Sequence, residues 1–237
     1  MSAFQDQLCD MHVHTCYSHD CATPLRTLQH LARKHNVMMA VTDHNQIGGS
    51  LAMNALGVRI IPGIEVTTKN LKDFLVYFYD YDNLTDFYER YVKPALNPGR
   101  IWGSRTTLTE EELFDAISTF DSFTSLAHPY CPVPKRSANT APSIMRQIDA
   151  IEVMNFAMSP KANQKAAMLC DSLSKPHTAG SDSHHPNTFG MVTLRGFSEE
   201  PADFLTETKQ GLGTVVGLQR KNKDVIDKVV QYLATKA

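Results

Sequence analysis

The sequence has little net charge, no long apolar run and few cysteines. Its 237 residues include 23 Lys and Arg against 25 Asp and Glu, a formal net charge of −2, so no broad basic surface is available for stable binding of nucleic acid. No stretch approaches the roughly 18 apolar residues that a membrane-spanning helix needs. The first residues, MSAFQDQLCD, lack the basic start and apolar run of a signal peptide. We expect a cytoplasmic protein with no membrane partner.

The cysteines form neither a disulfide framework nor a zinc-finger pattern. Their number is odd and they are scattered along the chain, at Cys9, Cys16, Cys21, Cys131 and Cys170. Without a secretory signal, we expect free thiols in a reducing compartment. Zinc accepts thiolate ligands, but a single CxxxxC spacing with no partner pair is weak evidence for such a site. We interpret Cys16, Cys21 and Cys131 as neighbours of a site and not as ligands.

Short apolar runs alternate with helical patterns through most of the chain. The runs are CDMHV, VMMAVTD, VRIIPGIEV, DFLVYFY, FTSLAHP, DAIEVMN and HTAGSD, with GTVVGL as a further candidate. Their continuous apolar character is typical of parallel strands that are covered on both faces. Thr23 is expected to cap a helix that begins at Pro24, and Thr109 and Glu112 match a capping box for another helix. Residues 162–173 and a C-terminal stretch over 221–236 are further expected helices.

This alternation of strands and helices predicts an α/β fold with a parallel sheet, either open or closed into a barrel. No glycine-rich dinucleotide fingerprint follows the first strand, where an open nucleotide-binding sheet would need one. Ionisable residues instead follow nearly every strand, which favours a barrel because (β/α) barrels build their active sites there. We predict a single barrel domain over residues 1–237, with the motifs in a core of about 8–218. Segments 81–107 and 129–142, which carry prolines, are expected to be irregular excursions near the mouth of the barrel.

The residues at the expected strand ends are of types that bind metal ions. They are His12 and His14, the TDHN of residues 42–45, Glu65, His128, Glu152 with Asn155, and the GSDSHH of residues 180–185. His12 and His14 are two apart in a strand, so both imidazoles point to one side and can meet one ion. Taken singly, a strand histidine is more often a hydrogen-bonded core residue, Asp43 could cap a helix, and Asp182 could form a turn. Together these groups would converge on one cavity and remain uncompensated unless metal ions paired them, so we predict a metal centre.

The ordered set HxH, TDHN, GIEV, AHP, EVxN and GSDSH resembles the polymerase and histidinol phosphatase (PHP) family. The similarity runs from about Asp10 to Gly190. It implies a distorted (β/α)7 barrel, with the metal site at the C-terminal ends of the strands, that binds two or three divalent ions, usually zinc, manganese or iron. Characterised members include histidinol-phosphate phosphatases, nucleotide and oligonucleotide phosphodiesterases, and proofreading domains of bacterial polymerases.

The resemblance also implies which residues would hold the ions. The first position would be formed by His12, His14, Glu65 and Asp182. Glu65 would bridge to a second position, which His128 would also serve. A third position would take His44, His184 and a residue from the loop after the first strand. The context Ser18-His19-Asp20-Cys21 favours Asp20 as that ligand and His19 as its neighbour.

One position departs from the family pattern. Members with three ions often carry a histidine on the fourth strand, in a pattern like VHILGY, and the matching residue here is Phe74. The second position would then keep two protein ligands, Glu65 and His128, fewer than the three or four usual for a held transition metal. We predict two tightly held ions, in the first and third positions, with the second position partly occupied or absent.

The resemblance implies hydrolysis of a phosphate ester by metal-activated hydroxide. The substrate would be a phosphomonoester or phosphodiester of a small metabolite, nucleotide or oligonucleotide. His128 or His185 could protonate the leaving group, and Asn155 would orient the substrate or a ligand. Residues that could hold the phosphate, or be solvated surface charges, are Arg100, Arg105, Lys135 and Arg136. Two alternatives stay open: a metal-dependent hydrolase of another bond such as an amide, and a metal-binding module with little activity.

Overall fold

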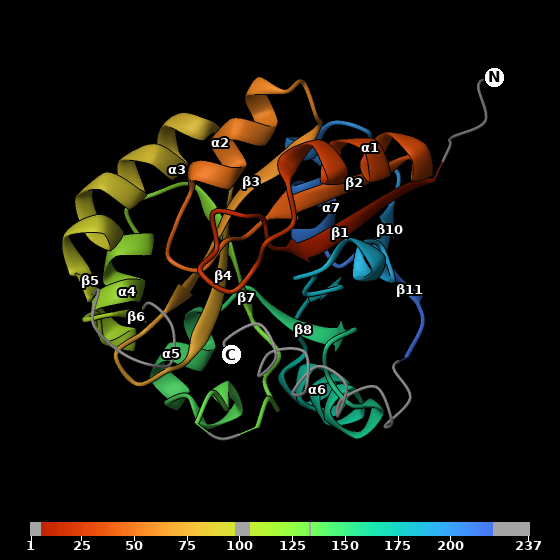
Figure 1. Cartoon of the computed structure of the whole chain (residues 1–237). Helices are drawn as coiled ribbons and strands as arrows, with labels where there is room; N and C mark the ends of the chain where they lie inside the picture. The colour runs from red at the N-terminus through yellow and green to blue at the C-terminus, as the bar shows by residue number, and fades with distance from the viewer. Residues whose placement is uncertain (1–5, 98–104, 133, 220–237) are drawn as a thin grey trace, which may run out of the picture.

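The computed structural model describes residues 6–97, 105–132 and 134–219, and its centre is a curved sheet (Figure 1). In this described part, nine strands are hydrogen-bonded in the order β11-β10-β1-β2-β3-β4-β7-β8-β9. Their bounds are β1 Gln7–Val13, β2 Val37–Val41, β3 Ile60–Thr67, β4 Asp73–Phe78, β7 Ser122–Leu126, β8 Ala150–Asn155, β9 His177–Gly180, β10 Val192–Gly196 and β11 Thr214–Gly217. Each apolar run of the sequence contributes to one of these strands, and β10 is an additional strand that the runs did not include.

The sheet nearly closes into a barrel where β1 meets the residues that follow β9. The His14 amide donates to the Ser183 carbonyl at 3.1 Å, and the Asp182 amide donates to the His12 carbonyl at 2.8 Å. Gly180 permits this approach, because a Cβ at that residue would lie 2.5 Å from the His12 Cβ. The expected distorted (β/α)7 barrel is confirmed, with β1, β2, β3, β4, β7, β8 and β9 around it and with β10 and β11 extending the sheet beyond β1.

Strand β4 runs antiparallel to both of its neighbours, so the expectation of a parallel sheet is wrong at this strand. Thr67 pairs with Asp73 in an antiparallel register on one side, and Phe74 pairs with Leu126 on the other. The connection from β3 to β4 spans only residues 68–72, which can close a hairpin but is too short for a crossover between parallel strands. The start of β4, and not its end, therefore lies beside the carboxyl ends of β3 and β7.

Helices cover the outside of the barrel (Figure 1). They are α1 Leu25–His35, α2 Gly48–Ala55, α3 Tyr81–Phe87, α4 Glu110–Ile117, α5 Pro142–Gln147, α6 Pro160–Leu173 and α7 Pro201–Lys209. The capping box is confirmed at α4, where the Thr109 hydroxyl accepts from the Glu112 amide and the Glu112 carboxylate accepts from the Thr109 amide. The expected cap by Thr23 is wrong, because Pro24 occupies the N-cap position of α1 and the Thr23 hydroxyl donates to the His184 carbonyl at 3.3 Å.

The segment that begins at residue 81 is largely helical, contrary to the expected irregular excursion. α3 continues into a π-helical turn and a 3-10 turn that together reach Ala95. Asp80 caps α3 by accepting from the Asn83 amide at 2.7 Å, and the buried side chains of Phe87 and Tyr88 join the core. A short strand β5 (Leu96–Asn97) then pairs with β6 (Arg105–Thr106).

Segment 129–142 is closer to expectation. Its described residues before Pro142 form turns and one 3-10 turn at Ser137–Asn139. The expected helix over 221–236 lies outside the described residues, as does Arg100. Among the described helices, none combines the length and the apolar character needed to cross a membrane.

Apolar side chains fill the barrel and pack between it and the helices. Inside the barrel, the Tyr77 hydroxyl donates to the Met11 carbonyl at 2.9 Å, and the Tyr77 ring stacks on Phe123. Outside the barrel, the Phe74 ring meets the Phe114 ring of α4 edge-on, with 5.3 Å between centroids. Because side chains alternate along a strand, Asp73 then faces the inside of the barrel at its mouth.

Candidate metal centre

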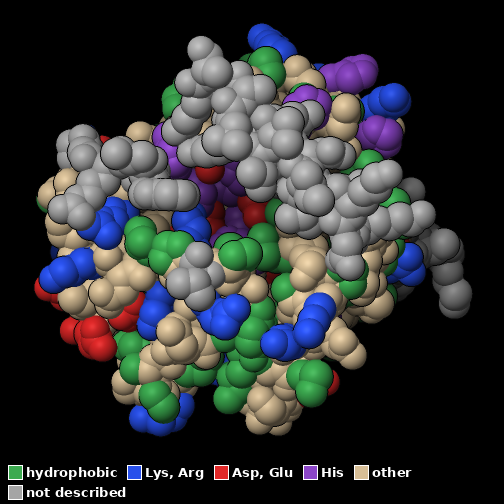
Figure 2. All heavy atoms as spheres, turned by 60° about the horizontal axis from the view of Figure 1, so that its bottom comes forward, with side chains coloured by type: hydrophobic (Ala, Val, Ile, Leu, Met, Phe, Trp, Pro, Cys, Tyr) green, Lys and Arg blue, Asp and Glu red, His purple; other side chains and the backbone are tan. Residues whose placement is uncertain are grey.

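The strand ends bring histidine and carboxylate side chains together at one mouth of the barrel. Figure 2 shows histidine and acidic side chains at the floor of a hollow in this face. The residues that the resemblance implies as ligands all lie in groups whose donor atoms are close together: His12, His14, Asp20, His44, Glu65, His128, Asp182 and His184. His12, His14 and Glu65 have no exposed surface, and His128 and Asp182 are 6% and 7% exposed.

The first position joins β1, β3 and the turn after β9. The Nε2 atoms of His12 and His14 are 3.1 Å apart, and each lies 3.4 Å from Glu65 Oε2. Asp182 Oδ1 lies 3.4 Å from His14 Nε2 and 3.8 Å from His12 Nε2. Four donor atoms this close together can surround one ion, which nitrogen and oxygen ligands approach to about 2.0–2.2 Å.

The third position lies nearer to solvent and joins the β1–α1 loop to the ends of β2 and β9. Asp20 Oδ2 lies 3.1 Å from His184 Nε2 and 3.5 Å from His44 Nε2. The other His44 nitrogen, Nδ1, lies 3.0 Å from Glu65 Oε2, so Glu65 links this group to the first position. His19 is exposed and its ring lies beside that of His44, with 5.4 Å between centroids. Asp20, and not His19, contacts both histidines of this position.

The second position has a candidate ligand that the sequence interpretation missed. Glu65 Oε1 lies 3.1 Å from His128 Nε2, and Asp73 Oδ2 lies 3.9 Å from the same nitrogen. Asp73 is fully buried at the mouth, whereas Phe74 packs outside the barrel. The structure corrects the expected shortage, because three carboxylate and histidine side chains converge here and not two. The signal in the sequence was Asp73 itself, an acidic residue at the first position of an apolar strand and directly after the short loop of residues 68–72.

The cluster holds more buried polar atoms than its own hydrogen bonds satisfy. Among the described residues, buried atoms with no hydrogen-bond partner include His14 Nδ1, His128 Nδ1, Glu65 Oε2 and Asp73 Oδ1. Leaving a buried polar atom unpaired costs roughly 1–3 kcal/mol, and more for a charged group. Divalent cations would pair the carboxylates, and a donor set of imidazoles and carboxylates suits zinc, manganese or iron. The residues at the mouth therefore fit the metal ions that the resemblance implies.

Burial and neighbouring charges shift the pKa values of these side chains in opposite directions. Burial lowers the pKa of His14 to about 3, and the adjacent His184 imidazole acts in the same direction, so His14 is neutral. Burial by itself would raise the pKa of Glu65, but the His44 and His12 imidazoles hold that pKa well below its usual range. The pKa of Asp182 is held down in the same way, chiefly by His12. Burial by itself would lower the pKa of His12, His44 and His128, but neighbouring carboxylates, Glu65 among them, raise it, to about 9 for His44. Because metal ligands are neutral imidazoles and ionised carboxylates, an ion that binds here would displace the protons of these histidines.

Unusual backbone conformations aim some of the side chains at the mouth. His128 at the end of β7 and Asp182 after β9 have φ angles of 27° and 51°, in a region that residues other than glycine rarely adopt. Asn45 after β2 has a φ of 51°, and its side-chain oxygen accepts from the Thr67 amide at 2.9 Å. Such conformations persist where the surrounding contacts over-determine them, and they concentrate at functional sites.

Glu152 and Asn155 of β8 form a layer behind the ligands. Glu152 Oε1 lies 2.9 Å from His12 Nδ1, and Oε2 accepts from the His128 amide at 2.7 Å and from Asn155 Nδ2 at 3.1 Å. Because a carboxylate can only accept, we infer that His12 carries its proton on Nδ1 and presents the Nε2 lone pair to the first position. Asn155 also donates to Asp182 Oδ2 at 3.4 Å, so its side chain contacts a candidate ligand.

Replacing Glu152 with glutamine is expected to weaken metal binding about 10- to 100-fold, the usual cost of losing a carboxylate behind a histidine ligand. Glutamine keeps the size of the side chain but removes the charge that fixes the proton on His12. The dissociation constant for Mn²⁺ or Zn²⁺ is measured by competition with a coloured chelator, with the exposed Glu111→Gln as the matched control. Equal affinities for the wild type and Glu152→Gln would contradict this role.

The remaining expected site residues differ in how close they come to the cluster. His185 is exposed, and its Nδ1 accepts from the Asn187 amide at 3.3 Å. The Arg105 guanidinium donates to the Lys69 carbonyl at 3.3 Å, and Arg136 is exposed. Lys135 is the described basic residue that reaches the ligands, because its Nζ lies 3.1 Å from Asp73 Oδ2.

The cysteines near the mouth belong to none of the ligand groups found among the described residues. Cys16 is exposed, and the buried Cys21 thiol contacts the backbone carbonyls of His14 and His184 at 3.5 and 3.4 Å. Burial, with the negative charge of Asp73, raises the pKa of Cys131 to about 12. The absence of these cysteines from the ligand groups of the described residues is consistent with their interpretation as neighbours of the site.

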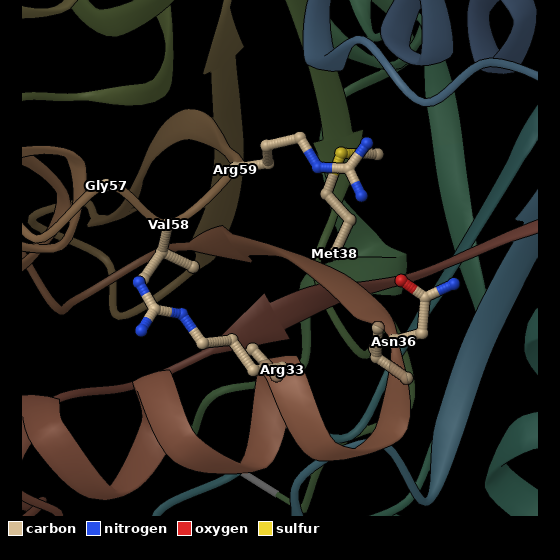
Figure 3. A pocket seen from close by; sticks show the side chains of 8 residues that line it. Arg33, Asn36, Met38, Gly57, Val58 and Arg59 are labelled. Atoms are coloured by element: carbon tan, nitrogen blue, oxygen red, sulfur yellow. The ribbon is translucent and has the colours of Figure 1, made fainter.

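A separate cavity of about 310 Å³ lies beside Val37 and Met38, the first two residues of β2; Figure 3 shows it from close by. The side chains of Arg33 from α1 and of Arg59 line it, and Arg59 pairs with Glu199 at 2.9 Å. The lining residues include none of the candidate ligands. This cavity is therefore distinct from the candidate metal centre.

A barrel with histidine and carboxylate ligands at its strand ends is typical of metal-dependent hydrolases. A family model of the PHP domain matches residues 10–212, and the chain therefore belongs to the PHP family. A comparison of the sequence with curated proteins found no match.

Solved structures with the same fold share little sequence with this chain. PsfC from Pseudomonas syringae PB-5123 is 16% identical with a TM-score of 0.69, over 98% of this chain and 99% of that one. The lesion-specific endonuclease PfuEndoQ from Pyrococcus furiosus is 18% identical with a TM-score of 0.69, over 91% of this chain but only 60% of the endonuclease. A two-domain protein from Bacteroides vulgatus ATCC 8482, described as containing a predicted PHP-like metal-dependent phosphoesterase, is 15% identical with a TM-score of 0.65, over 96% and 70% of the two chains. These similarities establish the fold.

Proposed function

We propose that this protein hydrolyses phosphate esters with the help of bound divalent metal ions. The observation that carries the proposal is the convergence of three ligand groups on one mouth, with Glu65 within 3.4 Å of His12 and His14, 3.0 Å of His44 and 3.1 Å of His128. Membership of the PHP family supports the same class of reaction. So do structural neighbours that are described as containing a predicted PHP-like metal-dependent phosphoesterase and as a lesion-specific endonuclease.

The first position has four candidate ligands, and His14 lies close enough to Asp20, His44 and His184 to add a fourth to the third position, against three at the second. We therefore assign the tightly held ions to the first and third positions. The proposed ligands are His12, His14, Glu65 and Asp182 for the first position and Asp20, His44 and His184 for the third. A bound zinc, manganese or iron ion lowers the pKa of a coordinated water toward about 7 and neutralises charge on phosphoryl oxygens.

The chain's own residues would orient the reactants around these positions. Glu152 fixes the proton of His12, and Asn155 holds Asp182 in place. Lys135 places a positive charge beside the ligands, where an anionic substrate would approach. Because His185 Nδ1 accepts from the Asn187 amide, the neutral His185 ring carries its proton on Nε2, the form that can donate to a leaving oxygen.

The proposed substrate is a phosphomonoester or phosphodiester of a small metabolite, nucleotide or oligonucleotide. An endonuclease Q structure with a 27-mer duplex substrate is 19% identical to this chain with a TM-score of 0.72, which makes a diester a specific candidate to test. This chain covers only 60% of the length of that endonuclease, so its activity does not transfer directly and is for this chain a proposal to be tested.

A substrate panel tests the class of reaction. The purified protein is incubated with Mn²⁺ or Zn²⁺ and an aryl phosphate, an aryl phosphodiester or an aryl amide, and product release is followed by absorbance. We expect hydrolysis of at least one ester at about 10³ times the rate of the amide or more, because the charged transition state of phosphoryl transfer gains most from the clustered cations. Cleavage of the amide alone would assign another hydrolase reaction, and no cleavage of any substrate would favour a metal-binding module.

A further inference from the structure

The loop after β7 folds back over the metal centre and carries Lys135 to it. The Cys131 amide donates to the His128 carbonyl at 2.8 Å, and the Ala138 amide donates to the Pro129 carbonyl at 2.9 Å. The Ser137 hydroxyl donates to the Ala127 carbonyl at 3.0 Å and ties the far side of the loop to the end of β7. These bonds return the chain toward the mouth and place the Lys135 side chain over it.

Lys135 contacts one of the three side chains that converge on the second position. Its Nζ lies 3.1 Å from Asp73 Oδ2, the oxygen that is 3.9 Å from His128 Nε2. Asp73 has no exposed surface, while the Lys135 side chain is 32% exposed and can leave toward solvent. Among the described residues, Lys135 is the one lysine or arginine whose ion pair reaches the ligand cluster.

A buried carboxylate needs a cation, and two cations compete for Asp73. A divalent ion at the second position would use the carboxylate that the ammonium now contacts, and it would lie within a few ångströms of a like charge. The repulsion between the two cations therefore disfavours holding both at this carboxylate. The sequence predicted weak metal binding at the second position because a ligand was missing there. The structure offers a different cause: a third candidate ligand, Asp73, is present, and Lys135 pairs with it.

We propose that the Lys135 ammonium takes the place of the second metal ion, so that the centre combines two divalent ions with one fixed lysine charge. This inference rests on the metal centre of the proposed function and says what completes it. The first and third positions keep their ions, and Lys135 neutralises Asp73. Removing the ammonium would open the second position, with Glu65, His128 and Asp73 as its ligands.

Counting bound ions tests the proposal without measuring activity. Wild type and Lys135→Met are equilibrated with the same buffered free concentration of Mn²⁺, and the ions bound per chain are determined by plasma mass spectrometry. The variant is expected to bind one more ion than the wild type, with at least about 10²-fold higher affinity at that position because the nearby like charge is gone. Adding Asp73→Asn to Lys135→Met should remove the extra ion again.

Arg136→Met is the matched control, since it removes an adjacent, exposed positive charge and should leave the count unchanged. The same count in Lys135→Met as in the wild type would overturn the proposal, provided that a thermal melt shows the variant folded. Lys135→Ala serves as the second variant if the methionine form fails to fold. An extra ion in Arg136→Met would also overturn it, because net charge would then explain the gain. An extra ion in a protein that hydrolyses no phosphate ester would sustain this inference and refute the proposed function, so the two can fail separately.

Discussion

Replacing His14 with alanine is expected to abolish hydrolysis of a phosphate ester and to leave the barrel folded. His14 Nε2 lies within 3.4 Å of His12, Glu65 and Asp182, and the same residue belongs to the group formed by Asp20, His44 and His184. One substitution therefore weakens both the first and the third positions. Because a bound ion contributes several kcal/mol to the transition state, we expect kcat/KM to fall by about 10³-fold or more.

The measurement is the initial rate on an aryl phosphate ester with Mn²⁺ or Zn²⁺ in excess, joined to a circular dichroism spectrum for the fold. His30→Ala is the matched control, because His30 lies exposed on α1 and belongs to none of the ligand groups among the described residues. It should keep the activity of the wild type. If His14→Ala retained activity within tenfold of the wild type, the ligand assignment at the first position would be wrong.

Removing the metal ions is expected to lower the melting temperature by about 10 °C. An ion present at about 1,000 times its Kd stabilises the native state by about 4 kcal/mol. For a chain of this size, each kcal/mol of stability shifts the melting temperature by about 2–4 °C. The physical cause is the pair of buried carboxylates Glu65 and Asp182, which lose the cations that neutralise them. Melting is followed by calorimetry before and after treatment with a chelator, and again after the ion is returned.

The same pair of variants controls this experiment. His30→Ala should show the full shift, and His14→Ala should show a much smaller one because it binds fewer ions to lose. A chelated wild type that melts at the same temperature as the loaded protein would show that the cluster does not hold ions in the native state.

The positions of the site were predictable where the period of a strand fixes them. His12 and His14 are two apart at the end of a buried strand, so their side chains necessarily share a face, and they lie 3.1 Å apart. The other strand-end residues followed from the rule that the carboxyl ends of barrel strands meet at one mouth. That rule does not depend on the conformation of the loops. It therefore predicted correctly that the residues at the strand ends meet at one mouth: His44, Glu65, His128 and Asp182.

Asp73 was missed because its place depends on the direction of a strand, which apolar character alone does not reveal. In a parallel β4 this residue would lie at the far end of the barrel. In the antiparallel β4 it lies at the mouth, next to Thr67 of β3. The short connection over 68–72 contained the clue, since a loop of that length joins antiparallel strands.

The sequence could not show which basic loop residue lies nearest the metal centre, because the path of a loop follows no periodic pattern. Lys135, Arg136 and Arg105 were equivalent candidates for phosphate binding, and only Lys135 contacts the cluster. Likewise, Pro94 favoured an irregular segment after residue 81, but buried aromatic side chains hold that stretch helical.

The rate of phosphate-ester hydrolysis by metal-stripped and reloaded protein shows whether bound ions carry the reaction. The protein is stripped with a chelator until plasma mass spectrometry finds no bound transition metal, then divided, and one portion is reloaded with Mn²⁺ or Zn²⁺. We expect no hydrolysis above the buffer rate in the stripped portion, and recovery of activity in the reloaded portion in proportion to the ions bound. Full activity in the stripped protein, or none after reloading, would contradict the proposed function.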